Sequence, residues 1–234
     1  MGIDARLKLA RLYLCTDARQ EQGDFAEFVE AAVRGGVDII QLRQKGLPQQ
    51  QEIELVQQMR RIVQAHRGLS VVNDSPEIAG TAGADVVHLG QDDTAPARAR
   101  THLSSYAKIG RSTHDPDQIR AALDNLEVDY FAVGPVWQTP TKPDAVPVGV
   151  ELVRTATTLA PPSDPTSKPW FAIGGVDASN LDVLIEAGAR RICVVRAICD
   201  ADDPEEAARV LKDRLRQAWQ DDPAMQDYLT RAVR

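Results

Sequence analysis

Two basic residues follow an apolar, β-rich run early in the chain, in the segment Gln41-Leu42-Arg43-Gln44-Lys45. Alternate residues of a β-strand face the same side, so Gln41, Arg43 and Lys45 are predicted to point together. Two cations two residues apart, directly after buried strand positions, are typical of a site that binds a diphosphate. A solvated pair of surface cations is the alternative that this segment alone leaves open.

Two acidic residues end the next two apolar runs. Asp74 follows residues 71–73, and Asp93 follows residues 88–92. If these runs are neighbouring parallel strands, the two carboxylates meet at one edge of the sheet, and oxygen ligands of this kind suit Mg²⁺. Taken singly, the first acidic residue indicates an ordinary turn and the second an ordinary helix N-cap. Their coincidence with the basic pair favours a metal site beside a bound diphosphate.

Hydroxyl groups, glycines and further cations end the later apolar runs. The residues are Ser112, Thr139, Pro140, Thr141, Lys142, Gly175, Val195 and Arg196. Prolines restrict the loop after residue 134, so its hydroxyls and ammonium group are presented to a ligand at a small entropic cost. Paired glycines allow a ligand to approach the backbone closely, and arginine binds phosphate strongly. These residues predict a second phosphate site, although the loop alone also fits a rigid surface loop.

β-rich runs and helical patterns alternate along the chain. We predict strands at residues 12–16, 38–42, 69–73, 85–89, 108–112, 130–134, 170–174 and 191–195. We predict helices near residues 25–34, 49–66, 76–82, 95–103, 116–123, 150–159, 180–187 and 204–219. Alternation of this kind indicates parallel strands with crossover helices, and eight such units in 234 residues favour a closed barrel. The predicted fold class is α/β, a single-domain (β/α)8 TIM barrel over residues 1–220 with a C-terminal tail over residues 221–234. The tail is polar and is expected to be either a short helix or frayed.

In such a barrel the carboxyl ends of all strands open on one face, where active sites lie. The predicted metal site and both predicted anion sites fall at these ends. Two phosphorylated ligands together with Mg²⁺ indicate group transfer with diphosphate as the leaving group. We expect His66, His88 and His102 to be structural.

The overall charge and the cysteines limit the classes of partner and location. The net charge is −7 and the pI is about 5.2, with no basic stripe, which argues against nucleic acid as a partner. No apolar run reaches the length of a membrane span, and the N-terminus lacks the apolar core of a signal peptide. Cys15, Cys193 and Cys199 are odd in number and lack metal-ligand spacing, so we expect reduced thiols in a cytoplasmic protein.

Taken in order, these residues resemble the thiamine-phosphate synthase family from residue 12 to about residue 208. The matching motifs are Gln41-Leu42-Arg43-x-Lys45, Asn73-Asp74, Val87-His88-Leu89-Gly90-Gln91-x-Asp93, Gly110-x-Ser112-Thr113-His114, Gly134-Pro135 with Thr139-Pro140-Thr141-Lys142-Pro143, Ile173-Gly174-Gly175, and Val194-Val195-x-Ala197-Ile198. Each motif is short, but their order along one barrel is specific.

The resemblance implies a transferase of thiamine biosynthesis. Its reaction would condense 4-amino-2-methyl-5-(diphosphooxymethyl)pyrimidine with 4-methyl-5-(2-phosphooxyethyl)thiazole, giving thiamine phosphate and diphosphate. Mg²⁺ would be held by Asp74 and Asp93. The residues implied in catalysis are Arg43, Lys45, Ser112 and Lys142. The residues implied in substrate binding are Gln41, Leu42, Arg43, Gln44, Lys45, Asn73, Ser112, Thr139, Pro140, Thr141, Lys142, Gly175, Val195 and Arg196. The expected partners are the two small-molecule substrates and further copies of the chain in a homo-oligomer.

Two positions depart from the family pattern. The family commonly has glutamate where this chain has Gln44, a side chain that we expect to point away from the ligand. It commonly has serine where this chain has Arg196. We expect Arg196 to bind the thiazole phosphate, with an ion pair to Asp177 or Asp200 as the alternative.

Three other functions stay open at this point. A thiazole tautomerase-like relative would share the barrel and the thiazole phosphate site, but is expected to lack the metal carboxylates and the Arg-x-Lys pair. A barrel isomerase or lyase of another pathway is expected to carry an acid/base pair at its strand ends instead. A non-catalytic barrel that binds thiamine precursors would release no diphosphate.

Overall fold

The computed structural model describes residues 1–140 and 145–231, and its strands form one closed parallel barrel. The strands follow one another around the barrel in sequence order, and the last pairs with the first. They are β1 (Leu12–Thr16), β2 (Ile39–Leu42), β3 (Leu69–Asn73), β4 (Val86–Leu89), β5 (Lys108–Thr113), β6 (Tyr130–Val133), β7 (Trp170–Ile173) and β8 (Ile192–Val194). The predicted (β/α)8 barrel is confirmed, and every predicted strand overlaps an observed one.

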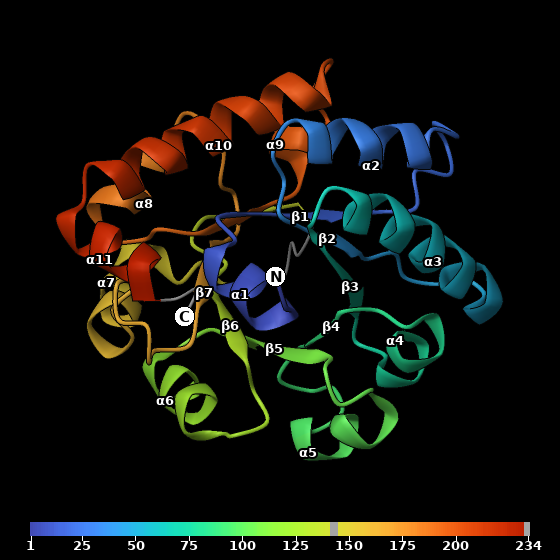
Figure 1. Ribbon diagram of the computed structural model, residues 1–234, viewed down its shortest axis with the longest axis horizontal. Coiled ribbons are helices and arrows are strands. Elements are labelled where there is room, and N and C mark those ends of the chain that lie inside the picture. The colour runs from blue at the N-terminus through green and yellow to red at the C-terminus, as the bar shows by residue number, and fades with distance from the viewer. Residues whose placement is uncertain (141–144, 232–234) are drawn as a thin grey trace.

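Helices surround the barrel and cover its outer surface (Figure 1). They are α1 (Ile3–Leu9), α2 (Phe25–Arg34), α3 (Gln49–Ala65), α4 (Pro76–Ala82), α5 (Pro96–Ala99), the 3-10 helix η1 (Arg100–His102), α6 (Pro116–Asp124), α7 (Gly149–Leu159), α8 (Leu181–Glu186), α9 (Arg196–Cys199), α10 (Pro204–Gln220) and α11 (Pro223–Arg231). Helix α2 shows why they pack this way, because its buried residues recur at intervals of three and four and form one apolar stripe. These residues are Phe25, Phe28, Val29, Ala32 and Val33.

Two of these helices are absent from the sequence prediction, and a third forms in the segment for which a short helix or a frayed tail was expected. Helices α1 and α9 contain seven and four residues, which is too short for helical periodicity to be distinguished. Helix α11 occupies the predicted C-terminal tail, and its Met225 and Tyr228 pack against Trp219 of α10. In Figure 1, α1 lies in front of the middle of the barrel, and its Leu7 joins the core inside the barrel. This helix therefore closes one end of the barrel.

The strand residues separate into two core layers. Residues of one parity, such as Tyr13 and Ile39, face the barrel interior. Residues of the other parity, such as Leu14 and Ile40, pack against the helices. Because successive side chains alternate, each strand delivers every second residue to the inside of the barrel. Within the described residues, no helix is both long enough and apolar enough to cross a membrane.

Candidate active site

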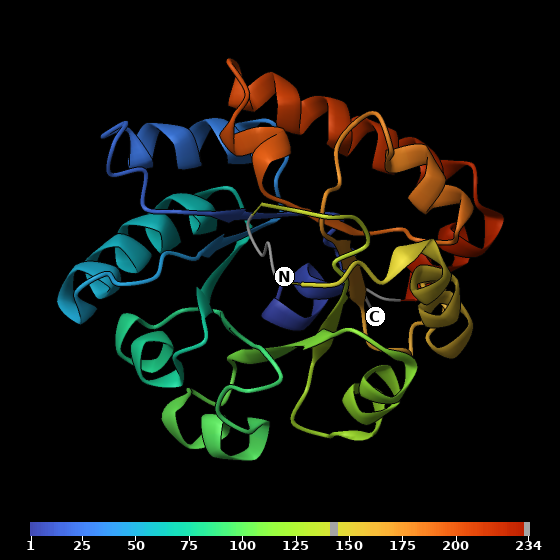
Figure 2. The ribbon, with the colours of Figure 1, turned by 180° about the vertical axis from the view of Figure 1, so that it is seen from behind.

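A cavity of about 870 Å³ opens at the carboxyl ends of the strands. Figure 2 views the barrel from this end, with α1 behind it. Every strand contributes to the lining. The contributing strand residues include Cys15, Gln41, Asn73, His88, Ser112, Ala132, Ile173 and Cys193. Residues far apart in sequence therefore meet in one hollow, on the face where barrel enzymes carry their active sites.

Two cations stand on one side of this cavity. Arg43 and Lys45 follow β2 and line the cavity together with Gln41, which confirms the predicted alternation. Within residues 1–140 and 145–231, neither cation forms a salt bridge. Their positive charge is therefore available to an anionic ligand.

Asp74 and Asp93 lie on the same rim, after the adjacent strands β3 and β4. Burial, followed by the hydrogen bonding and the charge of Asp93, raises the pKa of Asp74 to about 6. A hydrogen bond from Asn73 and the charge of Arg43 act on this pKa in the opposite direction. The backbone N–H of Gly90 donates to Asp93 Oδ2 at 2.5 Å. Crowding of two carboxyl groups favours a cation between them.

The donor set at this rim fits Mg²⁺. Carboxylate oxygens are hard ligands, and Mg²⁺ in proteins is commonly held by one or two carboxylates with phosphate oxygens and water. In the part of the chain that the structure describes, no cluster of three or more His, Cys, Asp or Glu side chains is arranged to hold a metal. A Mg²⁺ ion held by Asp74 and Asp93 would therefore complete its coordination with ligand oxygens and water.

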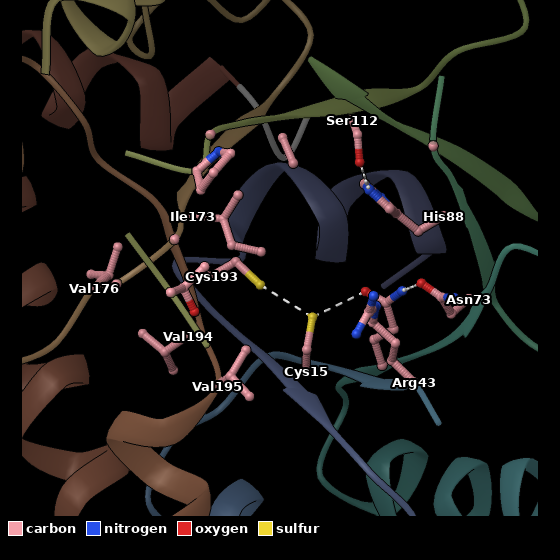
Figure 3. A pocket seen from close by; sticks show the side chains of 18 of the residues that line it. Cys15, Arg43, Asn73, His88, Ser112, Ile173, Val176, Cys193, Val194 and Val195 are labelled. Atoms are coloured by element: carbon pink, nitrogen blue, oxygen red, sulfur yellow. Dashed lines mark hydrogen bonds between the residues drawn. The ribbon is translucent and has the colours of Figure 1, made fainter. Parts of the chain in front are cut away.

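The floor of the cavity is polar and hydrogen-bonded (Figure 3). Gln41 Nε2 donates to Asn73 Oδ1 at 2.8 Å, and Gln41 Oε1 accepts from Cys15 Sγ at 3.1 Å. On the other side of the floor, His88 Nε2 and Ser112 Oγ lie 3.0 Å apart. Gln41 is 3% exposed, so protein contacts rather than solvent determine the orientation of its carboxamide.

Two glycines follow β7 on another side of the cavity. Gly174 and Gly175 adopt positive φ values of 102° and 67°. A Cβ atom on Gly174 would lie 2.4 Å from Pro135 Cα, and one on Gly175 would lie 2.9 Å from Trp137 Cβ. The backbone N–H of Trp137 also donates to the carbonyl of Gly174 at 3.0 Å. The paired glycines thus let the loop after β6 pack on β7, a role that the sequence analysis did not assign to them.

Thr139, Gly175, Val195 and Arg196 line the cavity beside this loop. Arg196 is the exposed first residue of α9. No described carboxylate forms a salt bridge with Arg196, so neither of the two ion pairs considered as alternatives is observed. Its charge faces the cavity without a protein counter-ion in the described residues.

Leu42 and Gln44 do not reach this cavity. Leu42 is fully buried and packs in the outer core layer against the helices. Gln44 lines a neighbouring hollow of about 480 Å³, and its Oε1 accepts from the N–H of Ala18 at 2.8 Å. Both residues alternate with the inward-facing set, so their side chains point away from this cavity, as we expected for Gln44. The part in substrate binding that the family resemblance implies for them stays a prediction.

Three predicted residues of the loop remain. Pro140 is exposed and is not part of the cavity lining. Thr141 and Lys142 lie outside the described residues. Their predicted contacts with phosphate groups stay predictions.

Comparison with known proteins identifies the family. Residues 12–198 match the family model described as thiamine monophosphate synthase. This chain belongs to that family. The thiamine-phosphate synthase of Streptomyces avermitilis is 50% identical over 213 residues, which cover 91% of this chain and 97% of that protein. The one from Mycobacterium tuberculosis is 52% identical over 221 residues, which cover 91% of this chain and 97% of that protein.

A solved structure agrees with this assignment. Thiamine phosphate pyrophosphorylase from Pyrococcus furiosus has a TM-score of 0.79 and 28% sequence identity to this chain. The similarity covers 91% of this chain and 98% of the other. The predicted family, whose members are transferases of thiamine biosynthesis, is therefore confirmed together with the barrel.

Buried polar side chains beneath the family motifs were not predicted from the sequence. His88 was expected to be structural, yet it lines the cavity and is hydrogen-bonded to Ser112. Its position in β4 carried a signal, because it has the same parity as the inward-facing Val86. Tyr13 and Tyr130 also lie in the barrel interior, and their hydroxyl groups are 3.1 Å apart. No local pattern predicts that contact, since the two residues are 117 positions apart.

Proposed function

We propose that this chain joins the diphosphooxymethyl pyrimidine to the phosphooxyethyl thiazole, forming thiamine phosphate and releasing diphosphate. One observation supports this proposal above the others. The cations Arg43 and Lys45, the carboxylates Asp74 and Asp93, and the phosphate-type donors around Gly175 line a single cavity. Two phosphorylated substrates can therefore be bound next to each other, as a condensation requires.

In this proposal the side chains of Arg43 and Lys45 bind the pyrimidine diphosphate. Neither has a salt-bridge partner in the described residues, so the diphosphate does not have to displace one. Mg²⁺ held by Asp74 and Asp93 would neutralise charge on the departing diphosphate. Lys142, which the family resemblance implies in the same role, lies outside the described residues.

We propose a dissociative substitution. The C–O bond to the diphosphate breaks, the methyl carbon of the pyrimidine becomes positively charged, and the thiazole nitrogen forms the new C–N bond with its lone pair. No proton is transferred, so the site needs no strong base. It needs cations that stabilise the leaving group and a hollow that keeps water from the carbocation.

The thiazole phosphate is assigned to the part of the cavity at the ends of β6, β7 and β8. Thr139, Gly175 and Val195 line this part of the cavity, and Thr139 supplies a hydroxyl group. Arg196 supplies a fixed charge in place of the serine that is common in the family, and its guanidinium group can bind two phosphate oxygens together. The family resemblance adds Thr141, which lies outside the described residues.

A coupled assay tests this function. The purified chain is mixed with both substrates, with Mg²⁺ or with EDTA, and diphosphate and thiamine phosphate are measured separately. We expect equal amounts of both products, dependent on Mg²⁺ and on both substrates. Absence of diphosphate release would favour a tautomerase-like or sensory barrel. Release of diphosphate without thiamine phosphate would indicate a hydrolase.

We further propose that the two phosphorylated substrates are the small-molecule partners and that the chain acts in the cytoplasm. The three cysteines are free thiols, which supports the location. Assembly into a homo-oligomer stays a prediction, and light scattering coupled to size-exclusion chromatography tests it. A single species at the mass of one chain would contradict it.

A further inference from the structure

A continuous row of hydrogen bonds crosses the barrel beneath the cavity. Its members, in order, are Asn73, Gln41, Tyr13, Tyr130, His88 and Ser112. Successive donor–acceptor distances are 2.8, 2.8, 3.1, 2.9 and 3.0 Å. The four inner members are between 0 and 9% exposed, so water competes little for their hydrogen bonds. The row connects β3, which ends at Asn73, to β5, which contains Ser112.

The protons that these side chains can donate allow only one direction of donation along the row. Tyr13 Oη donates its only proton to Gln41 Oε1, so it must accept from Tyr130 Oη. Tyr130 then has no proton left for His88, so His88 Nδ1 carries the proton and donates to Tyr130. In a neutral imidazole Nε2 is the acceptor, and it takes the proton of Ser112 Oγ.

The other end of the row fixes this direction. Cys15 Sγ is a second donor to Gln41 Oε1, which places the carboxamide oxygen on that side. On its other side, the carboxamide nitrogen of Gln41 donates to Asn73 Oδ1 at 2.8 Å. Because the oxygen of the Gln41 carboxamide can only accept, the row does not reverse.

We infer that Tyr13 and Tyr130 are positioning residues that hold Ser112 Oγ as an acceptor toward the cavity, and that the site selects a heterocycle presenting an N–H donor there. The inference deepens the proposed function, in which the donor is the 4-amino group of the pyrimidine. An oxo group at that ring position has no proton to donate, so its oxygen lone pair would face the lone pair of Ser112 Oγ. The site would reject it, because a buried polar group would be left without a partner.

The residues packed around the two tyrosine rings fix the positions of the tyrosine hydroxyl groups in the row. A Cβ atom on Gly110 would lie 2.2 Å from Tyr130 Cζ, so only glycine leaves room for this ring. The Tyr130 and Tyr13 rings both meet Phe171 edge-on, with centroids 5.7 and 5.4 Å away. The hydroxyl groups are thereby held at fixed positions by the packing of their rings.

Tyr130→Phe tests the inference, with Tyr228→Phe as its matched control. Both changes remove one buried hydroxyl group, but the Tyr228 hydroxyl donates to the carbonyl of Lys8 and accepts from Arg191 Nη2, away from the row. The first measurement is the ¹⁵N chemical shifts of the His88 ring, assigned by difference from His88→Asn. The second is binding of the pyrimidine diphosphate against its 4-oxo analogue.

We expect wild-type His88 to carry its proton on Nδ1. In Tyr130→Phe the Nε2–H tautomer should become populated, and preference for the amino ligand should fall by about tenfold or more. Tyr228→Phe should leave both readouts unchanged. Tyr13→Phe should have the stronger effect, because it frees the Tyr130 proton to donate to His88 Nδ1, and it serves as the test if Tyr130→Phe does not fold.

An Nε2–H tautomer in the wild type, or unchanged ligand preference in the folded variants, would overturn the inference. Both measurements are made without turnover, so they do not depend on the proposed reaction. If the amino ligand is preferred but no diphosphate is released, the proposed function fails and the inference stands. If coupling occurs with equal affinity for the two ligands, the inference fails and the function stands.

Discussion

Replacing Arg196 by serine tests the position at which this chain departs from the family pattern. A hydrogen bond to a charged group typically contributes about 1.5–3 kcal/mol. Arg196 is exposed, so solvent and salt screen its charge and the lower end of that range applies. Since about 1.4 kcal/mol corresponds to a factor of ten, the Michaelis constant for the thiazole phosphate should rise about tenfold.

Folding should be unaffected by this change. Arg196 has no salt-bridge partner in the described part of the chain, and the free energy of unfolding should stay within about 0.5 kcal/mol of the wild-type value. Arg61→Ser is the matched control, because Arg61 is exposed on α3, away from the cavity, and loses the same charge. Its Michaelis constants should equal those of the wild type.

The assay is steady-state coupling with each substrate varied in turn, at low salt and at about 0.5 M salt, where the Debye length is only a few ångströms. The difference between wild type and Arg196→Ser should shrink at high salt. An unchanged constant for the thiazole phosphate at both salt concentrations would refute the reasoning. A rise confined to the pyrimidine diphosphate would assign Arg196 to the other anion, since it also borders the second hollow with Arg43 and Lys45.

Three further outcomes are expected. Asp74→Asn and Asp93→Asn should each lower turnover by about a hundredfold or more. The double variant should lower it little further, because the effects of groups that act as a unit are not additive. Near-normal Mg²⁺-dependent turnover in both single variants would contradict the metal site. Lys45→Ala should raise the Michaelis constant for the pyrimidine diphosphate by about tenfold or more and leave the Michaelis constant for the thiazole phosphate nearly unchanged. An equal rise in the two constants would indicate a distorted cavity. Gly174→Ala should lower the free energy of unfolding by about 3 kcal/mol, because the φ of this residue is 102° and a Cβ atom would lie 2.4 Å from Pro135 Cα. A denaturant melt equal to that of the wild type would show that the loop adapts.

The sequence alone determined the order of the barrel and much of one rim of its cavity. Repeating βα units place all strand ends on one face, so Asp74 and Asp93, after consecutive strands, had to be neighbours. Alternation in β2 directed Arg43 and Lys45 into the cavity and Leu42 to the outer core. These outcomes depend on local periodicity and on the sequence order of adjacent strands, and both can be read from the chain.

Only the tertiary structure decided what lies beneath that rim. The Tyr13 and Tyr130 hydroxyl groups meet because the barrel closes, and Gly174 is required because the loop after β6 packs upon it. Helix α1 closes the far end of the barrel, although seven residues are too few to show a periodic pattern. Side-chain contacts across a closed barrel depend on ring orientation, on the space left by glycines and on the direction of each hydrogen bond. No spacing along the chain encodes those quantities, because they arise only when all eight strands are paired.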